Sequence, residues 1–320
     1  MEIIKPGTSI NFVGKMPIAV GISLALIAAT VVLWFVRGPN LGIDFKGGTE
    51  IEITFTQDAP IEKVRAALKS VDLGMVEVKR LGGEKGVSES YIIRVEKKEI
   101  TTLDEGGESV DVSEVLINTL TGKVAPQDEK KLRVSLVGPR AGAELRRKAF
   151  ISVFVALVIM LIYIAVRFEV LFSFGAVLAL AHDVLITIGF LILSGKEFNL
   201  TTIAALLTIV GYSLNDTIVV YDRIRENMRK FRGGPLTDLI NASINETLSR
   251  TVLTSGTTLL VVLGLLFITR GSIQDFAYIM TMGIVVGTYS SVFVASSFIV
   301  YWKERIAPAL GLNKRKRGIA

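Results

Sequence analysis

Long apolar blocks separated by polar segments set the pattern of this 320-residue chain. A helix needs about 20 mostly apolar residues to cross a bilayer, and blocks of that length predict membrane spans. Six blocks qualify, at residues 17–36, 149–166, 171–194, 200–221, 251–269 and 276–302. No small-x-small cleavage site follows the first block, so we expect it to stay in place as an anchor.

A different pattern fills residues 37–147, between the first two blocks. Apolar and polar residues alternate there in four segments, as is typical of strands: 50–56, 75–81, 91–97 and 132–138. Helical spacing follows Pro60 and recurs at Val112, Val115, Leu116 and Leu120. The order strand-helix-strand-strand-helix-strand is that of a ferredoxin-like domain. We therefore predict a polytopic α-helical membrane protein, with six transmembrane helices and one α+β ferredoxin-like extracytoplasmic domain.

Basic residues indicate the orientation. They gather in segments that are cytoplasmic if the N-terminus is cytoplasmic, whereas the short outer loops hold only Lys196 and Arg270. Arg146 to Lys148 lie on the outer side, but long translocated domains escape this rule. Both termini are therefore expected in the cytoplasm. The expected order is a cytoplasmic N-terminus (1–16), transmembrane helix 1 (17–36), the extracytoplasmic domain (37–147), transmembrane helices 2–6 (148–302, with a cytoplasmic loop at 222–249) and a basic cytoplasmic tail (303–320).

Composition agrees with a membrane protein. Hydrophobic residues make up 50% of the chain and its mean hydropathy is +0.53, which a soluble domain of this size rarely reaches. The net charge of +6 comes from basic residues that flank the spans, so contact with anionic lipid explains it better than contact with nucleic acid. The chain has no cysteine, which excludes disulfides and thiolate sites.

The fourth block contains a carboxylate. Asp216, with Asn215 beside it, has apolar residues on both sides, and a charge within a bilayer span usually belongs to a functional pathway. Arg250 opens the next block, and Thr254 follows it at i+4 with Thr257 and Thr258 on the same predicted face. Two interpretations are open. Asp216 and Arg250 either pin two helices together or form a proton or ion coupling site, and we favour the second.

The third block carries a second candidate. His182, the only histidine, precedes Asp183 near the middle of the span. Such a pair can be a proton relay, a pH-sensitive element or a structural hydrogen-bond pair, and the sequence leaves all three open for His182. For Asp183 the depth of the charge favours a function.

The segment before the fifth block has a helical pattern of its own. It begins at Pro235 and runs to Arg250, with five apolar residues on one face: Leu236, Leu239, Ile240, Ile244 and Leu248. We expect this helix to lie along the inner membrane surface before the chain turns into the fifth span, or to be a simple linker.

Several motifs are missing from the sequence. It has no Walker A loop, no dinucleotide fingerprint and no histidine-rich metal pattern, so we expect no cofactor, no metal and no catalytic residue. The chain is not expected to be an enzyme.

Five segments together resemble a known family. They are GIDFKGGTE (42–50), VGPRAGAELRRKA (137–149), AHDV (181–184), GYSLNDTIVVYDRIREN (211–227) and INETLSRTVLTSGTT (244–258). In order and spacing they are similar to the signature segments of the bacterial SecF family, part of the SecD/SecF group in the resistance-nodulation-division superfamily. The similarity covers the whole chain. Ala141 stands where many relatives have a bulkier residue.

The resemblance implies a function in protein export. Family members work as a heterodimer with SecD in the bacterial inner membrane and use the proton-motive force, or sodium in some marine relatives, to promote preprotein translocation. The implied further partners are the SecYEG channel, SecA, unfolded preprotein and, as a candidate, YajC. The family's essential membrane residues fall on Asp216 and Arg250. Burial favours the protonated acid at Asp216 and a nearby arginine favours the carboxylate, so a helix shift would tie protonation to conformation.

Two other function classes remain open on the sequence alone. One is a small-molecule exporter of the same superfamily, which should carry a larger outer domain with a substrate pocket. The other is a structural membrane scaffold, which would need neither Asp216 nor Arg250.

Overall fold

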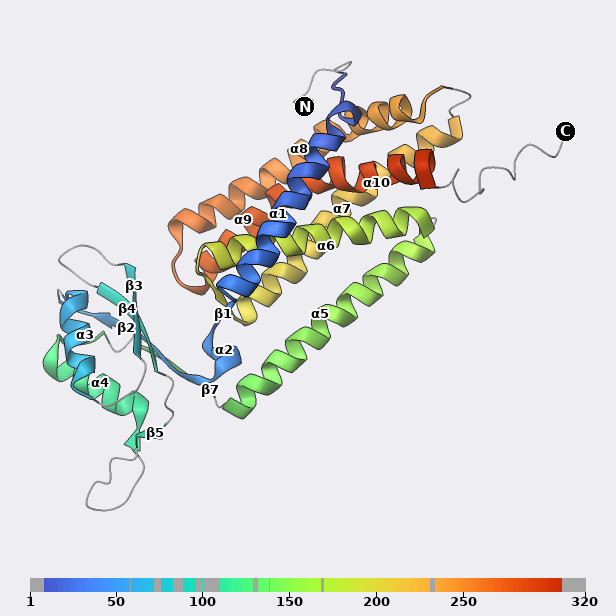
Figure 1. Cartoon of the computed structure of the whole chain (residues 1–320). Helices are drawn as coiled ribbons and strands as arrows, with labels where there is room; N and C mark the ends of the chain where they lie inside the picture. The colour runs from blue at the N-terminus through green and yellow to red at the C-terminus, as the bar shows by residue number, and fades with distance from the viewer. Residues whose placement is uncertain are drawn as a thin grey trace. The chain divides into compact units, whose positions relative to one another are not determined.

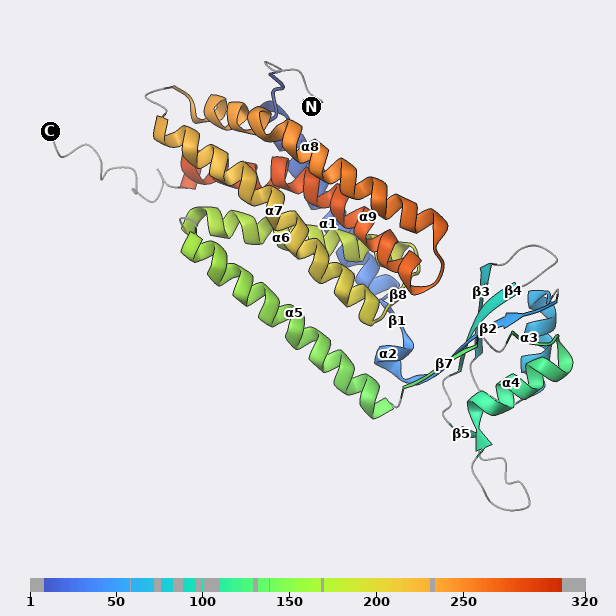
Figure 2. The same ribbon diagram turned by 180° about the vertical axis from the view of Figure 1, so that it is seen from behind.

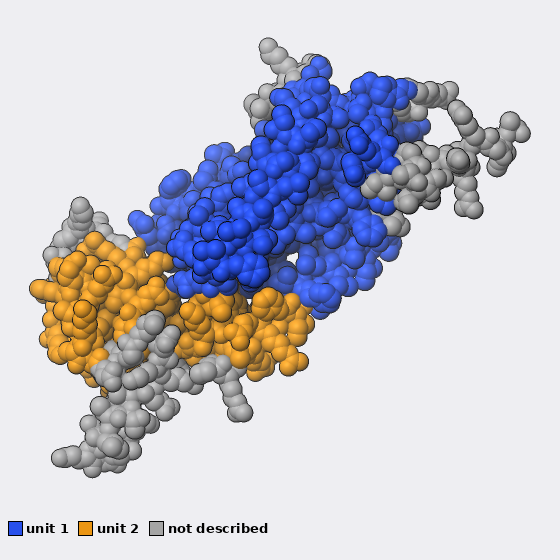
Figure 3. All heavy atoms as spheres, in the orientation of Figure 1, with its two compact units in different colours: residues 1–40, 152–197, 201–320 blue, residues 41–151, 198–200 orange. Residues whose placement is uncertain are grey.

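The computed structural model describes residues 9–306, apart from 58, 72–75, 83–88, 96–98, 101–109, 129–131, 138, 168–169 and 231–233. The chain divides into two compact units (Figure 3). The first consists of residues 1–40, 152–197 and 201–320, and the second of residues 41–151 and 198–200. The second unit contains the predicted outer domain, and the first contains most of the long apolar helices.

Six helices among the described residues are long and apolar enough to cross a membrane, which confirms the predicted number. The helices that carry them are α1 (Met16–Val36), α5 (Pro139–Arg167), α6 (Val170–Leu193), α7 (Leu200–Lys230), α8 (Leu236–Ile268) and α9 (Ser272–Ser290) with its continuation (Figure 1). A short 3-10 turn, η1 (Val13–Lys15), precedes α1. Within this unit α6 packs against both α1 and α9, and α8 packs along α9 (Figure 2).

The last span becomes π-helical twice. After α9 the chain is π-helical at η3 (Ser291–Ala295), α-helical at α10 (Ser296–Tyr301) and π-helical again at η4 (Trp302–Ile306). A π segment holds one residue more per turn than an α-helix and is frequent at functional sites. The Tyr221 hydroxyl donates a 2.9 Å hydrogen bond to the carbonyl of Ala295, at the end of η3.

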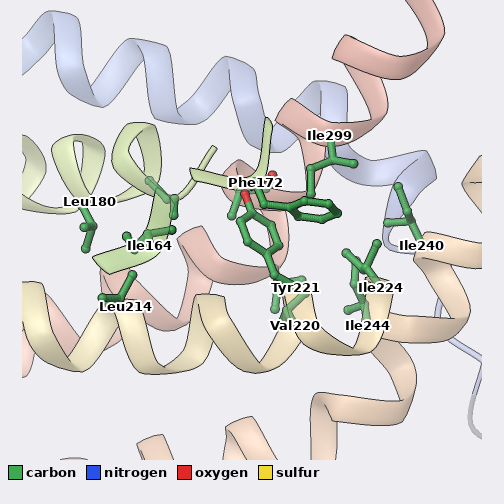
Figure 4. Close-up of a cluster of buried hydrophobic side chains, with 14 of the residues drawn as sticks. Ile164, Phe172, Leu180, Leu214, Val220, Tyr221, Ile224, Ile240, Ile244 and Ile299 are labelled. Atoms are coloured by element: carbon green, nitrogen blue, oxygen red, sulfur yellow. Dashed lines mark hydrogen bonds between the residues drawn. The ribbon is translucent and has the colours of Figure 1, made fainter. Parts of the chain in front are cut away.

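Helices α7 and α8 extend beyond the length of a span. α8 has 33 residues, or about 50 Å at 1.5 Å per residue, against a hydrocarbon core of about 30 Å. The prediction of a separate surface helix ending at Arg250 was wrong, because residues 236–268 form one unbroken helix. The polar first half of α8 instead buries its apolar face against α7, where Ile224, Ile240 and Ile244 meet (Figure 4).

The membrane unit has an apolar core around Tyr221. Its ring meets Phe172 edge-on at 5.1 Å, and Ile164 of α5, Leu180 of α6 and Ile299 of α10 belong to the same cluster (Figure 4). α5 begins about ten residues earlier than the predicted span, because residues 139–148 continue its helix. Most of the apolar surface of α5 and α1 is exposed in the single chain, where lipid or another protein can cover it.

The second unit has the predicted ferredoxin-like fold. Its sheet has the order β3-β4-β2-β7, built from β2 (Gly48–Phe55), β3 (Val76–Gly82), β4 (Glu89–Val95) and β7 (Arg133–Val137), and all pairs are antiparallel. Helices α3 (Ile61–Lys69) and α4 (Val112–Lys123) pack together on one face of the sheet (Figure 1). Ile51, Ile53 and Phe55 alternate into the core opposite Ile93 and Tyr91 of β4, so the period-two pattern is that of a half-buried sheet.

Short elements complete the chain. They are β1 (Asn40–Leu41), α2 (Ile43–Lys46), β5 (Glu99–Ile100), β6 (Val110–Asp111) and β8 (Glu197–Phe198), of which β1 pairs with β8 and β5 with β6. Two glycines follow α2, Gly47 (φ +82°) and Gly48 (φ +134°), in a backbone conformation that other residues rarely adopt. A Cβ at Gly142 would lie 3.1 Å from the Gly47 nitrogen, so the first turns of α5 pack tightly against this pair.

Candidate functional site

Asp216 lies in the interior of the membrane unit. The inward face of α7 carries Ser213 and Thr217 beside it among apolar residues, and only 2% of Asp216 is exposed. The Ser255 hydroxyl on α8 donates a 3.0 Å hydrogen bond to Asp216 Oδ2. Thr288 Oγ1 on α9 lies 2.8 Å from Ser255 Oγ, so hydroxyls from two other helices line up on the carboxylate. A carboxylate can accept about four hydrogen bonds, and Ser255 is the one donor among the described side chains.

Arg250 does not form an ion pair with Asp216 among the described residues. It lies on α8 five residues before Ser255 and is exposed. The predicted pair is therefore present on adjacent helices but separated. This is the arrangement in which a small shift of one helix would change the charge that Asp216 experiences.

Asn215 and Thr254 take different places from those the sequence suggested. Asn215 points outward from α7 and is exposed. Thr254 is half-buried, and its hydroxyl bonds to the carbonyls of Arg250 and Thr251 on its own helix. The buried polar face of α8 runs instead through Thr247, Thr251 and Ser255 at i+4 spacing. The sequence shows this i+4 spacing too. It could not be told apart from the face predicted above, on which Thr254 and Thr258 follow Arg250 at the same spacing.

Asp183 forms a second polar cluster on α6. It is fully buried, and its Oδ2 accepts hydrogen bonds from Ser213 of α7 and from Ser290 of α9, the latter at 2.7 Å. Its Oδ1 lies 2.8 Å from His182 Nδ1, and His182 Nε2 lies 2.9 Å from the hydroxyl of Ser23 on α1. The predicted His182–Asp183 pair is thus a contact that ties α6 to three other helices.

Helices α7 and α9 contribute side chains to both polar clusters. α7 carries Ser213 and Asp216 one turn apart, and α9 carries Thr288 and Ser290 two residues apart. A Cβ at Gly287 would lie 3.1 Å from the Ser213 Cβ, so α9 approaches α7 closely beside these groups. A displacement of α9 would disturb the surroundings of Asp183 and Asp216 together.

Three buried hydroxyls on the helices that carry these carboxylates have no hydrogen-bond partner among the described residues. They belong to Thr187 on α6, one turn after Asp183, and to Tyr212 and Thr217 on α7. Buried hydroxyls of this kind usually bind water. The described residues contain no group of three or more histidine and acidic side chains that would hold a metal ion.

Comparison with known proteins places the chain in a family. Residues 117–305 match the model "Protein export membrane protein SecD/SecF, C-terminal", and residues 32–59 match the "SecD/SecF GG Motif", which includes Gly47 and Gly48. The chain belongs to the SecD/SecF family. The protein-export interpretation is thereby confirmed over the exporter and scaffold alternatives, and the chain is a multi-pass membrane protein.

SecF sequences are similar over nearly their whole length. The protein translocase subunit SecF of Calditerrivibrio nitroreducens is 42% identical over 95% of this chain and 97% of its own. The SecF subunit of Vibrio alginolyticus is 40% identical over 96% of this chain and 95% of its own.

Solved SecDF structures are also similar. The crystal structure of SecDF from Thermus thermophilus, described as a translocon-associated membrane protein, has a TM-score of 0.79 and 38% identity over 93% of this chain. A SecDF structure in a super-membrane-facing form has a TM-score of 0.68 and 37% identity over 98% of this chain. The chain spans 39% and 41% of the length of these two proteins.

Proposed function

We propose that this chain works with a SecD-type chain to promote preprotein export, driven by protons that bind and leave Asp216. It has no enzymatic activity in this proposal, and nucleotide hydrolysis comes from SecA at the SecYEG channel, with YajC as a candidate further partner. It resides in the bacterial inner membrane with both termini in the cytoplasm, and its outer domain contacts unfolded preprotein. The alternative to test is that another ion, such as sodium, is transported in place of the proton.

The burial of Asp216 carries this proposal. A carboxylate inside a span costs several kcal/mol if it stays charged, and one neutral hydroxyl donor offsets little of that cost. Proton uptake removes the charge. Movement of Arg250 towards the site would favour the charged form again, because an opposite charge stabilises a carboxylate. Two protonation states would then favour two helix arrangements.

The unpartnered hydroxyls support a route for the proton. Tyr212 and Thr217 lie on α7 within about one turn of Asp216 along the chain, and their buried hydroxyls have no partner among the described residues, so they could bind water on a route to Asp216. One charge moving through about 100 mV releases roughly 2.3 kcal/mol, enough to shift a two-state equilibrium nearly fiftyfold. Export of a long chain would therefore take many cycles.

A SecD-type partner is supported by what the single chain leaves exposed. Asn215 and Arg250 are exposed polar residues on helices that cross the membrane, where lipid cannot satisfy them. The SecDF relatives are more than twice as long as the region that matches this chain. A SecD-type chain would supply the missing surface.

Asp216→Asn tests the coupling site. Asparagine keeps the size and most hydrogen bonding but removes the titrating group, so the chain should insert and assemble normally. Gradient-dependent export should fail in membrane vesicles, whereas SecA-driven, ATP-dependent translocation should continue. Asp222→Asn is the matched control, because Asp222 lies on the same helix but is only half-buried, 3.8 Å from Arg167.

Arg250 offers a second comparison. Arg250→Lys keeps the charge but loses the planar fork, so it should impair export less than Arg250→Met does. Full gradient-dependent export by Asp216→Asn at normal expression would make Asp216 structural and remove the proposed mechanism. Normal export in a sodium gradient but not in a proton gradient would keep the site and change the ion.

A further inference from the structure

A row of four short contacts leads from Asp183 to the backbone of α1. Asp183 Oδ1 contacts His182 Nδ1 at 2.8 Å, and His182 Nε2 contacts Ser23 Oγ at 2.9 Å. Ser23 Oγ contacts Tyr289 Oη at 3.1 Å, and Tyr289 Oη lies 2.6 Å from the carbonyl oxygen of Ala19. Each contact at such a distance is a hydrogen bond only if one hydrogen lies between the two atoms.

The number of hydrogens decides the charge state of this row. The Ala19 carbonyl can only accept, so the Tyr289 hydroxyl must donate to it. Ser23 must then donate to Tyr289 Oη, which leaves Ser23 no hydrogen for His182 Nε2. The ring must therefore supply a hydrogen at Nε2, and the contact with Asp183 needs another at Nδ1 or on the carboxyl.

A neutral imidazole beside an ionised carboxylate provides one hydrogen too few. The neutral ring, the serine and the tyrosine together carry three hydrogens, whereas the row has four contacts. We propose that His182 and Asp183 form a second proton-binding site, which holds one extra proton between Nδ1 and Oδ1. The four contacts are complete whether that proton belongs to the imidazolium or to the aspartic acid.

The surroundings suit this extra proton. Ser213 and Ser290 both donate to Asp183 Oδ2, which stays an acceptor in either form. The Tyr289 ring stacks on the imidazole with centroids 6.1 Å apart, at the limit where an aromatic face attracts a cation. His182 is 4% exposed, so bulk water does not complete the contacts.

Few other ionisable groups face the pair. α1 has none between Met16 and Val36, and η3 has none. α9 presents Tyr289, while its Asp275 and Tyr278 lie at least ten residues earlier, and α10 contributes only the exposed Tyr301. α7 presents Ser213, with Tyr212 next to it, and carries Asp216 one turn further along; no described hydrogen bond joins Tyr212 to the pair. Asp183 and Tyr289 are therefore the titratable partners of His182 among the described residues.

Release of the proton would break one contact of the row. With three hydrogens left, the contact that is lost is the link between α6 and α1, the link between α1 and α9, or the His182–Asp183 contact within α6. The hydrogen count does not depend on Asp216. Any role of this site in export, however, rests on the proposed function.

His182 can be observed directly because it is the only histidine of the chain. The test is ¹⁵N-histidine labelling of the full chain in lipid nanodiscs, with the two ring nitrogens read by NMR at about pH 7. We expect an imidazolium, or a neutral ring with hydrogen on Nε2 together with a carboxylic acid at Asp183, read from the ¹³C shift of its labelled carboxyl group. A neutral ring with its hydrogen on Nδ1, or one with hydrogen on Nε2 beside an ionised Asp183, would overturn the proposal.

Tyr289→Phe sharpens the experiment. It removes one hydrogen and two contacts, so the neutral ring with hydrogen on Nδ1 then satisfies both remaining contacts. We expect this form to appear, with proton affinity weakened about fivefold, as the loss of one hydrogen bond implies. Tyr278→Phe makes the same change on the same helix outside the row and should leave the spectrum unaltered. An unchanged spectrum in Tyr289→Phe would contradict the hydrogen count.

The outcome is separable from that of the proposed function. Asp216→Asn should leave the His182 spectrum unchanged, because no described hydrogen bond joins the two clusters. Loss of export in Asp216→Asn together with a neutral, Nδ1-protonated His182 would keep the proposed function and refute the second site.

Discussion

The serine that contacts Asp216 has a clearer part than the arginine expected to pair with it. Ser255 is the one described side chain that donates to this carboxylate, and Thr288 can donate to Ser255 in turn. A hydroxyl can donate to a carboxylate and accept from a carboxylic acid, so Ser255 can serve both protonation states by rotating. Arginine can serve only the charged one.

Ser255→Ala should therefore slow gradient-dependent export without preventing assembly. Loss of one hydrogen bond to a buried charged group costs roughly 1–3 kcal/mol, so a fall of about tenfold in the export rate is expected. Ser255→Thr should retain most of the rate. Thr257→Ala is the control, since Thr257 is exposed and bonds only to carbonyls of its own helix. Equal rates in Ser255→Ala and Thr257→Ala would show that the Ser255 contact is incidental.

Sequence could locate the carboxylates but not their partners. A charge surrounded by apolar residues marks depth in the membrane, which is why Asp216 and Asp183 were found. The run 250–258 has hydroxyls at five positions, so its pattern cannot fix which of them face inward. Ser23, Ser213 and Tyr289 come from helices far apart in the chain, and only the fold brings them to His182 and Asp183.

At the level of elements, glycines on α9 allow close helix packing. A Cβ at Gly283 would lie 2.2 Å from Ile209 Cδ1, and one at Gly287 would lie 3.1 Å from Ser213 Cβ. Small residues at such points let membrane helices approach and gain dispersion contacts. These contacts keep Ser290 and Thr288 within reach of the two carboxylates.

Gly287→Val should separate α9 from α7. Overpacking typically costs about 1–3 kcal/mol, so the thermal stability of the detergent-purified chain should fall measurably. Gly264→Val on α8 is the matched control, because nothing lies within 4 Å of a Cβ there. If both variants melt at the wild-type temperature, the close approach of α9 and α7 is not needed for stability.

In the outer domain, Tyr91 of β4 predicts a response to alkaline pH. Burial raises the pKa of its hydroxyl above the ordinary value, and Glu89, which accepts a hydrogen bond from it, raises this pKa further. A group whose pKa is higher in the folded state stabilises the fold below its unfolded pKa of about 10, and this contribution disappears at higher pH. Protease resistance of this domain in the full chain should therefore fall as the pH rises above about 10.

Tyr91→Phe should weaken that alkaline drop. It should also lower stability at neutral pH by roughly 1 kcal/mol or more, because the hydroxyl also lies 2.5 Å from the carbonyl of Ala59. The same alkaline loss in Tyr91→Phe would assign it to another group.

The pattern of the chain predicted elements better than their ends. Length and hydropathy sufficed for six spans, and period-two alternation sufficed for the ferredoxin-like sheet, since both follow from burial of one face or one whole segment. The polar half of α8 was misplaced because an amphipathic pattern does not reveal whether membrane or protein covers the apolar face. Here the protein covers it, through Ile224 of α7 and Phe12 before α1.

For the whole molecule, the proposed orientation can be tested by labelling. The chain has no cysteine, so each introduced one is unique. Thr121→Cys in the outer domain and Ser272→Cys at the start of α9 should react with an impermeant maleimide from outside intact cells. Ser9→Cys should react only after the membrane is opened. All three positions are exposed in the single chain. Labelling of Ser9→Cys from outside would reverse the topology.

The π-helical segment η3 has a consequence for anyone who compares or redesigns this last span. One residue advances an α-helix by about 100°, so an extra residue in a turn rotates everything after it by that amount. A helical wheel drawn through residues 272–306 as one α-helix would therefore place Ser296 and Ile299 on the wrong side. Ser290, before the segment, is in phase with Asp183, whereas Ile299, after it, is in phase with the cluster around Tyr221. Deleting a single residue between 291 and 295 would give a more regular helix in which only one of these two contacts could be kept.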